Sequence, residues 1–451
     1  MINRLTFILI LLLSINSYSQ NHSINGTITG LDDENVYLLK LMGERRKIVD
    51  TARTDATGAF TFQMNENTIP GMYMIINGPG KAVELIYNNE DIQFTTSGFE
   101  SSDGIQIISS VENLIYYDYL GIKGINLYKI DVLNSFLRKY PANDKFYNQA
   151  VIKYNSLKNQ LNFRIEKLVS DNPNTFASRY IKSDRPVIPD VLLSAEQQNE
   201  YLKLHHFDNV DFADTLLIHS TILTSKVVGY LSLNQKEAES QEQLEDLMLR
   251  SVDSVLYRAQ GNQQVYEFVV DFLISGFESI GFERGLTHIA NSTALDQFCE
   301  NTERKKELEN KLELIKKLAI GQPAPEFSTT DINGNIVDLY KIDADKTVLI
   351  FWASWCPHCD DIMPVIDSNI DENTQVIAIS IDESREDLMQ SISNSDYDWI
   401  NIAELKGWNG EIVEEYGIAA TPSIFILDKD KNIISKPLSR DEIKSVLSGS
   451  D

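Results

Sequence analysis

The spacing of hydrophobic and polar positions changes along the chain, and each spacing predicts a different kind of structure. Up to about residue 98, short apolar or alternating runs are separated by turn signals such as Asp55–Gly58 and Pro79-Gly80. Regularly spaced strands without helical stretches are typical of a small β-sandwich. The expected strands are Ile24–Gly30, Val36–Met42, Ala59–Met64, Met72–Ile76, Val83–Tyr87 and Ile92–Thr96.

Between about residues 111 and 317, apolar side chains recur every three or four positions, which indicates amphipathic helices. The longest stripe covers Tyr147–Leu168, and two more lie in Leu244–Val255 and Val265–Phe272. Such stripes usually face a core. The heavily charged segment Glu300–Lys317 predicts a solvated helix that connects this region to the last part of the chain. We therefore expect an α-helical middle domain with a linker helix.

From about Leu318 onward, strands alternate with helices, which predicts a mixed sheet with helices on both faces. Asn333-Gly334 marks a hairpin, and Thr347–Trp352 and Val376–Asp382 have the composition of buried strands. Further strands are expected at Ser423–Leu427 and Ile433–Ser435. The expected helices begin after Cys356 and cover Arg385–Ser393, Glu411–Tyr416 and Arg440–Leu447.

The start of the chain has the features of an export signal. Arg4 supplies positive charge, Leu5–Leu13 is a short apolar run, and Ser17 and Ser19 precede a cleavage point ahead of Gln20. The run is shorter than the roughly 20 apolar residues that span a bilayer. We expect a signal peptide over 1–19 and a mature protein that is soluble in the periplasm or cell envelope, an oxidising compartment.

Composition narrows the range of partners. The 451 residues exceed one ordinary core, and a hydrophobic share of 43% is enough for globular domains. The formal net charge is -26. Phosphates would be repelled by this charge, so we expect no nucleic-acid binding. Acidity serves solubility in this interpretation.

The cysteine pattern predicts a redox pair. The chain has three cysteines, Cys299, Cys356 and Cys359, which is too few for a disulfide framework. Cys356 and Cys359 follow a buried strand and open a helix, the context of a redox Cys-x-x-Cys. A structural zinc site needs four ligands, and the sequence has no second pair; His205 and His206 lie in another predicted domain. We expect no stable metal, and a lone packed thiol at Cys299.

The spacing assigns each cysteine a role. Cys356, at the helix start, exposes its sulfur to unpaired backbone N–H groups, which favour the thiolate that attacks a disulfide. Cys359 lies one turn deeper on the same face and can resolve the mixed disulfide. Between and after them, Pro357, His358, Asp360 and Asp361 are the candidates for tuning the redox potential. Protonated His358 would favour the thiolate, whereas the two aspartates oppose it.

The run Phe351–Cys359 resembles the active site of thioredoxin-like proteins. Gly321–Phe327, the hairpin after it and Met363-Pro364 are similar to the exported TlpA and ResA group of thiol-disulfide reductases. The resemblance implies a thioredoxin fold from Leu318 onward and a redox-active disulfide without a bound cofactor. It also implies, as partners, exported proteins with cysteines or disulfides and a membrane electron donor.

The same resemblance assigns the substrate-binding residues. Thr421-Pro422 precedes a strand about where thioredoxin-like proteins carry a cis proline that faces the cysteines. Thr421 would then present its backbone to an extended substrate. Trp355 would shape the apolar surface that contacts partners. Two departures are expected to matter. Ile362 replaces a glutamate common in the group, and Ile350 replaces the buried aspartate of thioredoxin. Proton transfer would then use water, His358 or Asp361.

The predicted fold class is multidomain, and its parts follow the changes in spacing. A β-sandwich domain (20–105) and an α-helical domain with linker helix (106–317) precede a C-terminal α/β thioredoxin-like domain (318–451). The β-domain resembles domains of unknown function that precede thioredoxin domains in exported bacterial proteins.

The predicted function is thiol-disulfide oxidoreduction through Cys-Pro-His-Cys, with reduction of exported proteins favoured by the flanking sequence. The alternatives are a disulfide oxidase or isomerase of the DsbA type, which the Pro357-His358 dipeptide suggests, and a partner-binding protein with an accessory redox domain. A thiol peroxidase fits less well, because Ala353 stands where such enzymes need threonine or serine.

Overall fold

The computed structural model describes residues 22–80, 82–98, 104–235, 238, 240–293, 303–395 and 397–448. The chain divides into two compact units, Met1–Leu233 and Asn234–Asp451. The expected signal peptide and Cys299 lie outside the described residues. Within the described ranges, no helix combines the length and the apolar character of a membrane span.

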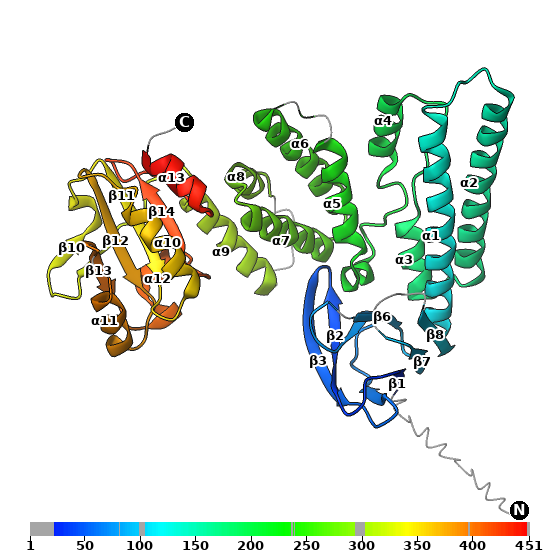
Figure 1. The fold of residues 1–451 in the computed structure, drawn as a ribbon, viewed down its shortest axis with the longest axis horizontal. Helices are drawn as coiled ribbons and strands as arrows, with labels where there is room; N and C mark the ends of the chain where they lie inside the picture. The colour runs from blue at the N-terminus through cyan, green and yellow to red at the C-terminus, as the bar shows by residue number, and fades with distance from the viewer. Residues whose placement is uncertain are drawn as a thin grey trace, which may run out of the picture. The chain divides into compact units, whose positions relative to one another are not determined.

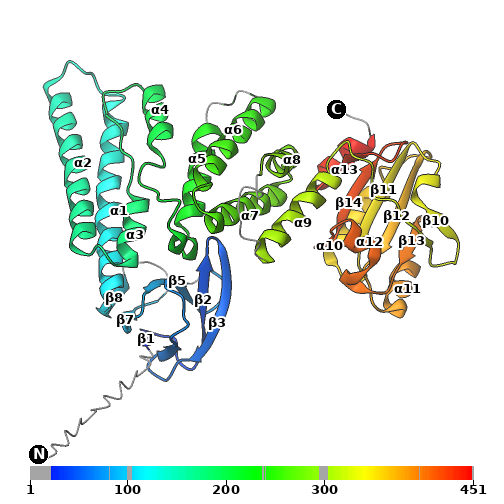
Figure 2. The same cartoon turned by 180° about the vertical axis from the view of Figure 1, so that it is seen from behind.

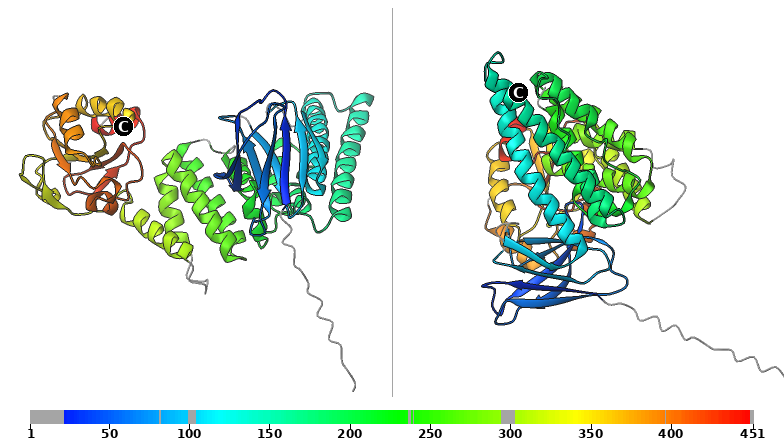
Figure 3. Two further views of the ribbon diagram at one scale, coloured as in Figure 1. Left: turned by 90° about the horizontal axis from the view of Figure 1, so that it is seen from below. Right: turned by 90° about the vertical axis from the view of Figure 1, so that its right-hand side faces the viewer.

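The first unit begins with two four-stranded sheets, in the orders β4-β1-β7-β8 and β3-β2-β5-β6 (blue in Figures 1 and 3). Buried side chains from both sheets, among them Ile24, Phe62 and Tyr73, form one core. The β-sandwich is thereby confirmed. The strands are β1 (His22–Ile28), β2 (Asn35–Met42), β3 (Arg45–Arg53), β4 (Ala59–Met64), β5 (Gly71–Ile76), β6 (Ala82–Tyr87), β7 (Ile92–Thr96) and β8 (Ile105–Ser109).

Two of these strands, β3 and β8, are absent from the sequence-based prediction. Both lie at the edge of a sheet. Nearly every residue of β3 is exposed, so no alternation of buried and exposed positions marks it in the sequence. Its strand form depends on antiparallel pairing with β2. Its charged start, Arg45-Arg46-Lys47, protects an open edge from pairing with another chain.

The helices of the first unit confirm the longest predicted stripe. In α2, Tyr154, Leu157, Leu161 and Ile165 are buried, and α2 packs along α1 (Figure 1). The bounds are α1 (Val111–Leu137), α2 (Lys145–Asp171), α3 (Phe176–Asp184), α4 (Ala195–His205), the 3₁₀ helix η2 (Thr215–His219) and α5 (Ile222–Gln235), which ends at the boundary with the second unit.

His219 makes the stability of the first unit sensitive to pH. The imidazole ends η2 beside Gly71 of β5, where an added Cβ would lie 2.7 Å from the His219 Cβ. Within the described residues, no hydrogen-bond partner reaches its buried Nδ1. Burial, with a smaller contribution from the positive charge of Lys40, lowers the pKa of His219 to about 4. The native state therefore holds this imidazole neutral.

We expect the protein to lose stability as the pH falls from 6.5 to 4. In this range His219 binds a proton in the unfolded chain but not in the folded chain. The full pKa difference corresponds to about 3 kcal/mol, which partial exposure of the ring reduces to about 1–2 kcal/mol. Urea unfolding at pH 7 and pH 4 measures this loss. On acidification, the unfolding free energy of His219→Gln should fall by about 1–2 kcal/mol less than that of the wild type. An equal fall in both proteins would contradict the assignment of this pH dependence to His219.

The second unit begins with four helices, α6 (Gln241–Ala259), α7 (Gln263–Ile280), α8 (Glu283–Ser292) and α9 (Glu303–Lys317). Helices α7, α8 and α9 pack against one another (Figure 2). The helical region expected at 106–317 is therefore shared between the two units. The charged α9 is more than a solvated connector, because Leu308 and Leu312 are buried and Leu314 packs against the core that follows.

That core belongs to a five-stranded sheet in the order β13-β12-β11-β14-β15. β11 pairs in parallel with β12 and antiparallel with β14. Ile366 of α10 and Ile443 of α13 complete the core, which confirms the α/β thioredoxin-like domain. The elements are β9 (Ser328–Thr330), β10 (Ile336–Asp338), β11 (Lys346–Trp352), α10 (Pro357–Asp367), β12 (Thr374–Ser380), α11 (Arg385–Ser393), β13 (Ile400–Ala403), α12 (Glu411–Glu415), β14 (Ser423–Leu427), β15 (Ile433–Ser435) and α13 (Arg440–Ser448).

Candidate active site

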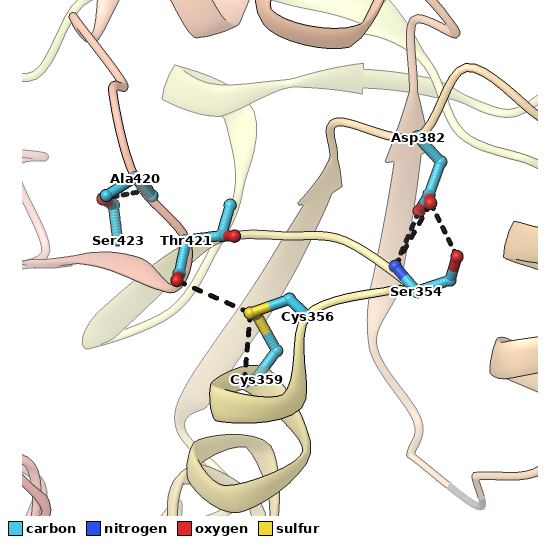
Figure 4. The surroundings of a disulfide bond; sticks show 7 residues. All are labelled: Ser354, Cys356, Cys359, Asp382, Ala420, Thr421 and Ser423. Atoms are coloured by element: carbon cyan, nitrogen blue, oxygen red, sulfur yellow. Dashed lines mark hydrogen bonds between the residues drawn. A yellow bond between two sulfur atoms is a disulfide. The ribbon is translucent and has the colours of Figure 1, made fainter. Parts of the chain in front are cut away.

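The cysteine pair lies where the central strand β11 passes into helix α10 (Figure 4). Cys356 is the N-cap residue of α10, and Pro357 occupies the first helical position. Proline fits this position because its fixed backbone angle is helical and its missing N–H would have no helical partner. The local sequence therefore places Cys356 at the helix start, as its motif predicts.

The two cysteines are joined in a disulfide, with their Cα atoms 5.4 Å apart. Cys356 retains 4% exposure, whereas Cys359 is fully buried. The backbone N–H of Cys359 donates to Sγ of Cys356 at 3.2 Å. This donor and the positive end of the helix favour negative charge on the Cys356 sulfur when the disulfide is reduced. Of the two sulfurs, that of Cys356 is therefore the more accessible and the better placed to carry negative charge.

Thr421 and Pro422 lie next to this sulfur. The Thr421-Pro422 peptide bond is cis, and the carbonyl oxygen of Thr421 lies 3.5 Å from Sγ of Cys356 (Figure 4). Ser423, at the start of β14, donates from its hydroxyl to the carbonyl oxygen of Ala420 at 2.8 Å. Residues far apart in the sequence are thus brought together at the redox centre.

The aromatic and charged candidates surround the pair at the surface. Trp355 is 59% exposed and makes an edge contact with Trp408, with ring centroids 6.4 Å apart. His358 and Asp360 are exposed. Trp355 therefore offers an apolar surface beside Cys356.

Asp361 forms an ion pair with a residue of another helix. Nη2 of Arg440, at the start of α13, lies 3.0 Å from its carboxylate. The negative charge of Asp361 is thus offset by a guanidinium.

Comparison with known proteins agrees with this geometry. The model of the AhpC/TSA family matches residues 320–436. The thiol-disulfide oxidoreductase ResA of Bacillus thuringiensis subsp. konkukian (strain 97-27) is 30% identical over 124 residues, which cover 27% of this chain and 70% of the relative. The chain belongs to the ResA-like thiol-disulfide oxidoreductases.

Other relatives of this ResA-like oxidoreductase have related names. The thioredoxin-like protein of Haemophilus influenzae (strain ATCC 51907 / DSM 11121 / KW20 / Rd) is 30% identical over 122 residues, which cover 27% of this chain and 71% of that protein. A thioredoxin-like protein from Bacteroides caccae ATCC 43185 has 23% identity and a TM-score of 0.46, covering 59% of this chain and 98% of that one. Two domains of unknown function, DUF4369 and DUF5106, match residues 22–116 and 153–273.

Asp382 is a site residue of the oxidoreductase that sequence reasoning missed. It lies two residues beyond Ser380, the last residue of β12, and is 2% exposed. Its carboxylate accepts hydrogen bonds from the backbone N–H of Ser354 at 3.0 Å and the Ser354 hydroxyl at 2.6 Å (Figure 4). It also accepts one from the Ser380 hydroxyl at 2.7 Å. These bonds hold the turn that carries Cys356. An acidic residue after an apolar strand was the available signal.

Ile350 and Ile362, the two positions where the sequence resemblance led us to expect carboxylates, have different surroundings. Ile350 is fully buried in β11. Ile362 of α10 is partly buried and lines a groove together with His358 and Asp361. Asp382 is a buried carboxylate near the Cys-x-x-Cys motif, and it lies just after the neighbouring strand β12. In the part of the chain that the structure describes, no three His, Cys, Asp or Glu side chains are grouped to hold a metal ion.

Proposed function

We propose that this oxidoreductase reduces disulfides of exported proteins in the periplasm or cell envelope, with Cys356 as nucleophile and Cys359 as resolving thiol. The observation that carries the proposal is the asymmetry of the pair. Cys356 is the more accessible cysteine and accepts the helix N–H of Cys359, whereas Cys359 is fully buried beneath it. A target disulfide therefore meets Cys356 first.

The reaction balances as a two-electron exchange. The Cys356 thiolate attacks one sulfur of the target disulfide, that bond breaks, and the other target sulfur leaves as a thiolate that takes a proton. The Cys359 thiolate then attacks Sγ of Cys356, and the second target thiol is released. The target gains two electrons and two protons, and the enzyme holds its own disulfide. A membrane dithiol donor would reduce it again.

The expected direction of electron transfer, from the protein to the target disulfide, can be tested by measuring the reduction potential. Equilibration against glutathione or dithiothreitol should give a reduction potential near the value of about -270 mV for thioredoxin, far from about -120 mV for DsbA. The exposed Asp360 opposes the thiolate, which favours the lower value. A potential near that of DsbA would overturn the reductase direction and favour an oxidase or isomerase. Catalysed consumption of peroxide would contradict both the reductase function and the oxidase or isomerase function.

A further inference from the structure

A groove of about 560 Å³ lies beside the redox pair, and its walls come from two parts of the second unit. One wall belongs to the thioredoxin-like domain and includes His358, Thr421 and Pro422. The other belongs to the helices that precede this domain and includes Leu286 of α8 and Ile315 of α9. The thioredoxin-like domain alone therefore forms only part of the groove.

The helical wall is held in place by buried and charged contacts. Nζ of Lys436 lies 2.5 Å from the carboxylate of Glu283, and these side chains are only 18% and 22% exposed. Leu318, just after α9, is buried in the core of the thioredoxin-like domain. Leu314 lies so close to Gly417 that a side chain there would collide with it. The wall is thus a defined surface of the redox site.

The groove surface is more apolar than polar, and the carboxylates, lysine and arginine that line it are paired. Asp361 pairs with Arg440, Glu283 with Lys436, and Glu278 with Lys311. Because paired charges leave little net field, the main gain available to an occupant is the burial of apolar surface. The partly or largely exposed apolar side chains lining the groove are Leu314, Ile315, Ile362, Ile418, Pro422 and Leu438.

The groove is continuous with the position of a target cysteine. The carbonyl oxygen of Thr421 lies 3.5 Å from Sγ of Cys356. Thr421 and Pro422 both line the groove. A polypeptide joined to Cys356 through its own cysteine therefore lies at the groove mouth. An extended chain advances about 3.3 Å per residue, so the residues next to the target cysteine enter the groove first.

We propose that the α8–α9 wall makes this groove a specificity site for an extended, uncharged apolar segment of a target protein, directly adjacent to the target's redox cysteine. The inference rests on the proposed function in one respect, namely that Cys356 exchanges disulfides with protein cysteines. The helices before the thioredoxin-like domain then select which disulfides are reduced.

Three disulfides test this selectivity in the full-length protein. Two are disulfide-linked peptide dimers that differ only in the three residues beside the cysteine, Leu-Val-Leu in one and Ser-Asn-Ser in the other. The third is hydroxyethyl disulfide, which is too small to fill the groove. We expect a preference of about tenfold for the apolar peptide, since each buried methylene group contributes roughly a factor of four. Ile315→Ser should reduce the preference to about twofold and leave the rate with hydroxyethyl disulfide unchanged.

Matched variants keep the test decisive. Leu438, 62% exposed on the opposite wall, should behave like Ile315 when replaced by serine. Ile336 is 80% exposed and lies outside the groove, so Ile336→Ser should keep the full preference. Equal wild-type rates with both peptides, or an unchanged preference in both groove variants, would overturn the proposed specificity site. If the protein neither reduces nor forms any of the three disulfides, the proposed function is overturned instead.

Discussion

Cys356→Ser should abolish disulfide turnover, with a loss of at least about a thousandfold, whereas Cys359→Ser should trap the protein on its target. A serine hydroxyl does not ionise near neutral pH and cannot form a mixed disulfide. In Cys359→Ser the accessible Cys356 still attacks, but nothing resolves the product. Reduction of a model disulfide with dithiothreitol as donor measures the first effect, and mass spectrometry of the trapped adduct measures the second.

Two further variants make the assignment of roles strict. The double variant Cys356→Ser/Cys359→Ser should form no adduct. Cys299→Ser in every background removes the remaining thiol of the chain as a source of adducts. An adduct mapped to Cys359 in the Cys356→Ser variant, with turnover retained, would reverse the roles. That outcome would conflict with the full burial of Cys359.

Local sequence patterns predicted the helices and strands that bury one face. They also predicted the redox chemistry of the Cys-x-x-Cys motif. Tyr147–Leu168 shows the helical period and lies within α2. Thr347–Trp352 is apolar throughout and lies within β11, the middle strand of its sheet. Cys356 caps the helix after β11 because the strand, the turn and Pro357 are all encoded between Lys346 and Pro357. Features whose cause is local were therefore accessible from the sequence.

Features that depend on distant pairing were not accessible. The exposed strand β3 is defined by its bonds to β2, and the short strand β13 (Ile400–Ala403) by parallel pairing with β12. The helical region divides between two units, and Leu314 and Leu318 pack with a core whose other members are spread along the chain from Ala324 to Leu447. The apolar stripe of α9 shows that one face is buried, but it does not show what covers that face.

Asp382 is the sharpest example of a distant feature, and its removal should have the second-largest effect on the protein. Its carboxylate is buried and accepts hydrogen bonds from three donor groups, two of them on Ser354, two residues before Cys356. Asp382→Ala leaves these donors without their acceptor in a buried site. Because bonds to a charged group contribute about 1.5–3 kcal/mol each and their effects are not additive, we expect a loss of about 2–4 kcal/mol in unfolding free energy.

A positioning role should also appear at Cys356 itself. Loss of the Asp382 contacts frees the turn that carries the nucleophile, so disulfide turnover should fall about tenfold or more. The pH dependence of Cys356 alkylation should change as well, because the sulfur loses its fixed place beside the N–H of Cys359. Asp382→Asn keeps the shape and one acceptor oxygen, so it should restore part of the turnover.

Ile433→Ala separates this role from simple destabilisation. Ile433 is fully buried in β15 and lies outside the bonds that hold Ser354. Its truncation should cost a similar 2–5 kcal/mol, yet it should leave the pH dependence of Cys356 alkylation as in the wild type. If Asp382→Ala and Ile433→Ala alter turnover and alkylation alike, Asp382 acts through fold stability alone. If they differ as expected, a carboxylate just beyond the neighbouring strand β12 positions the nucleophile in a site that has isoleucine at positions 350 and 362.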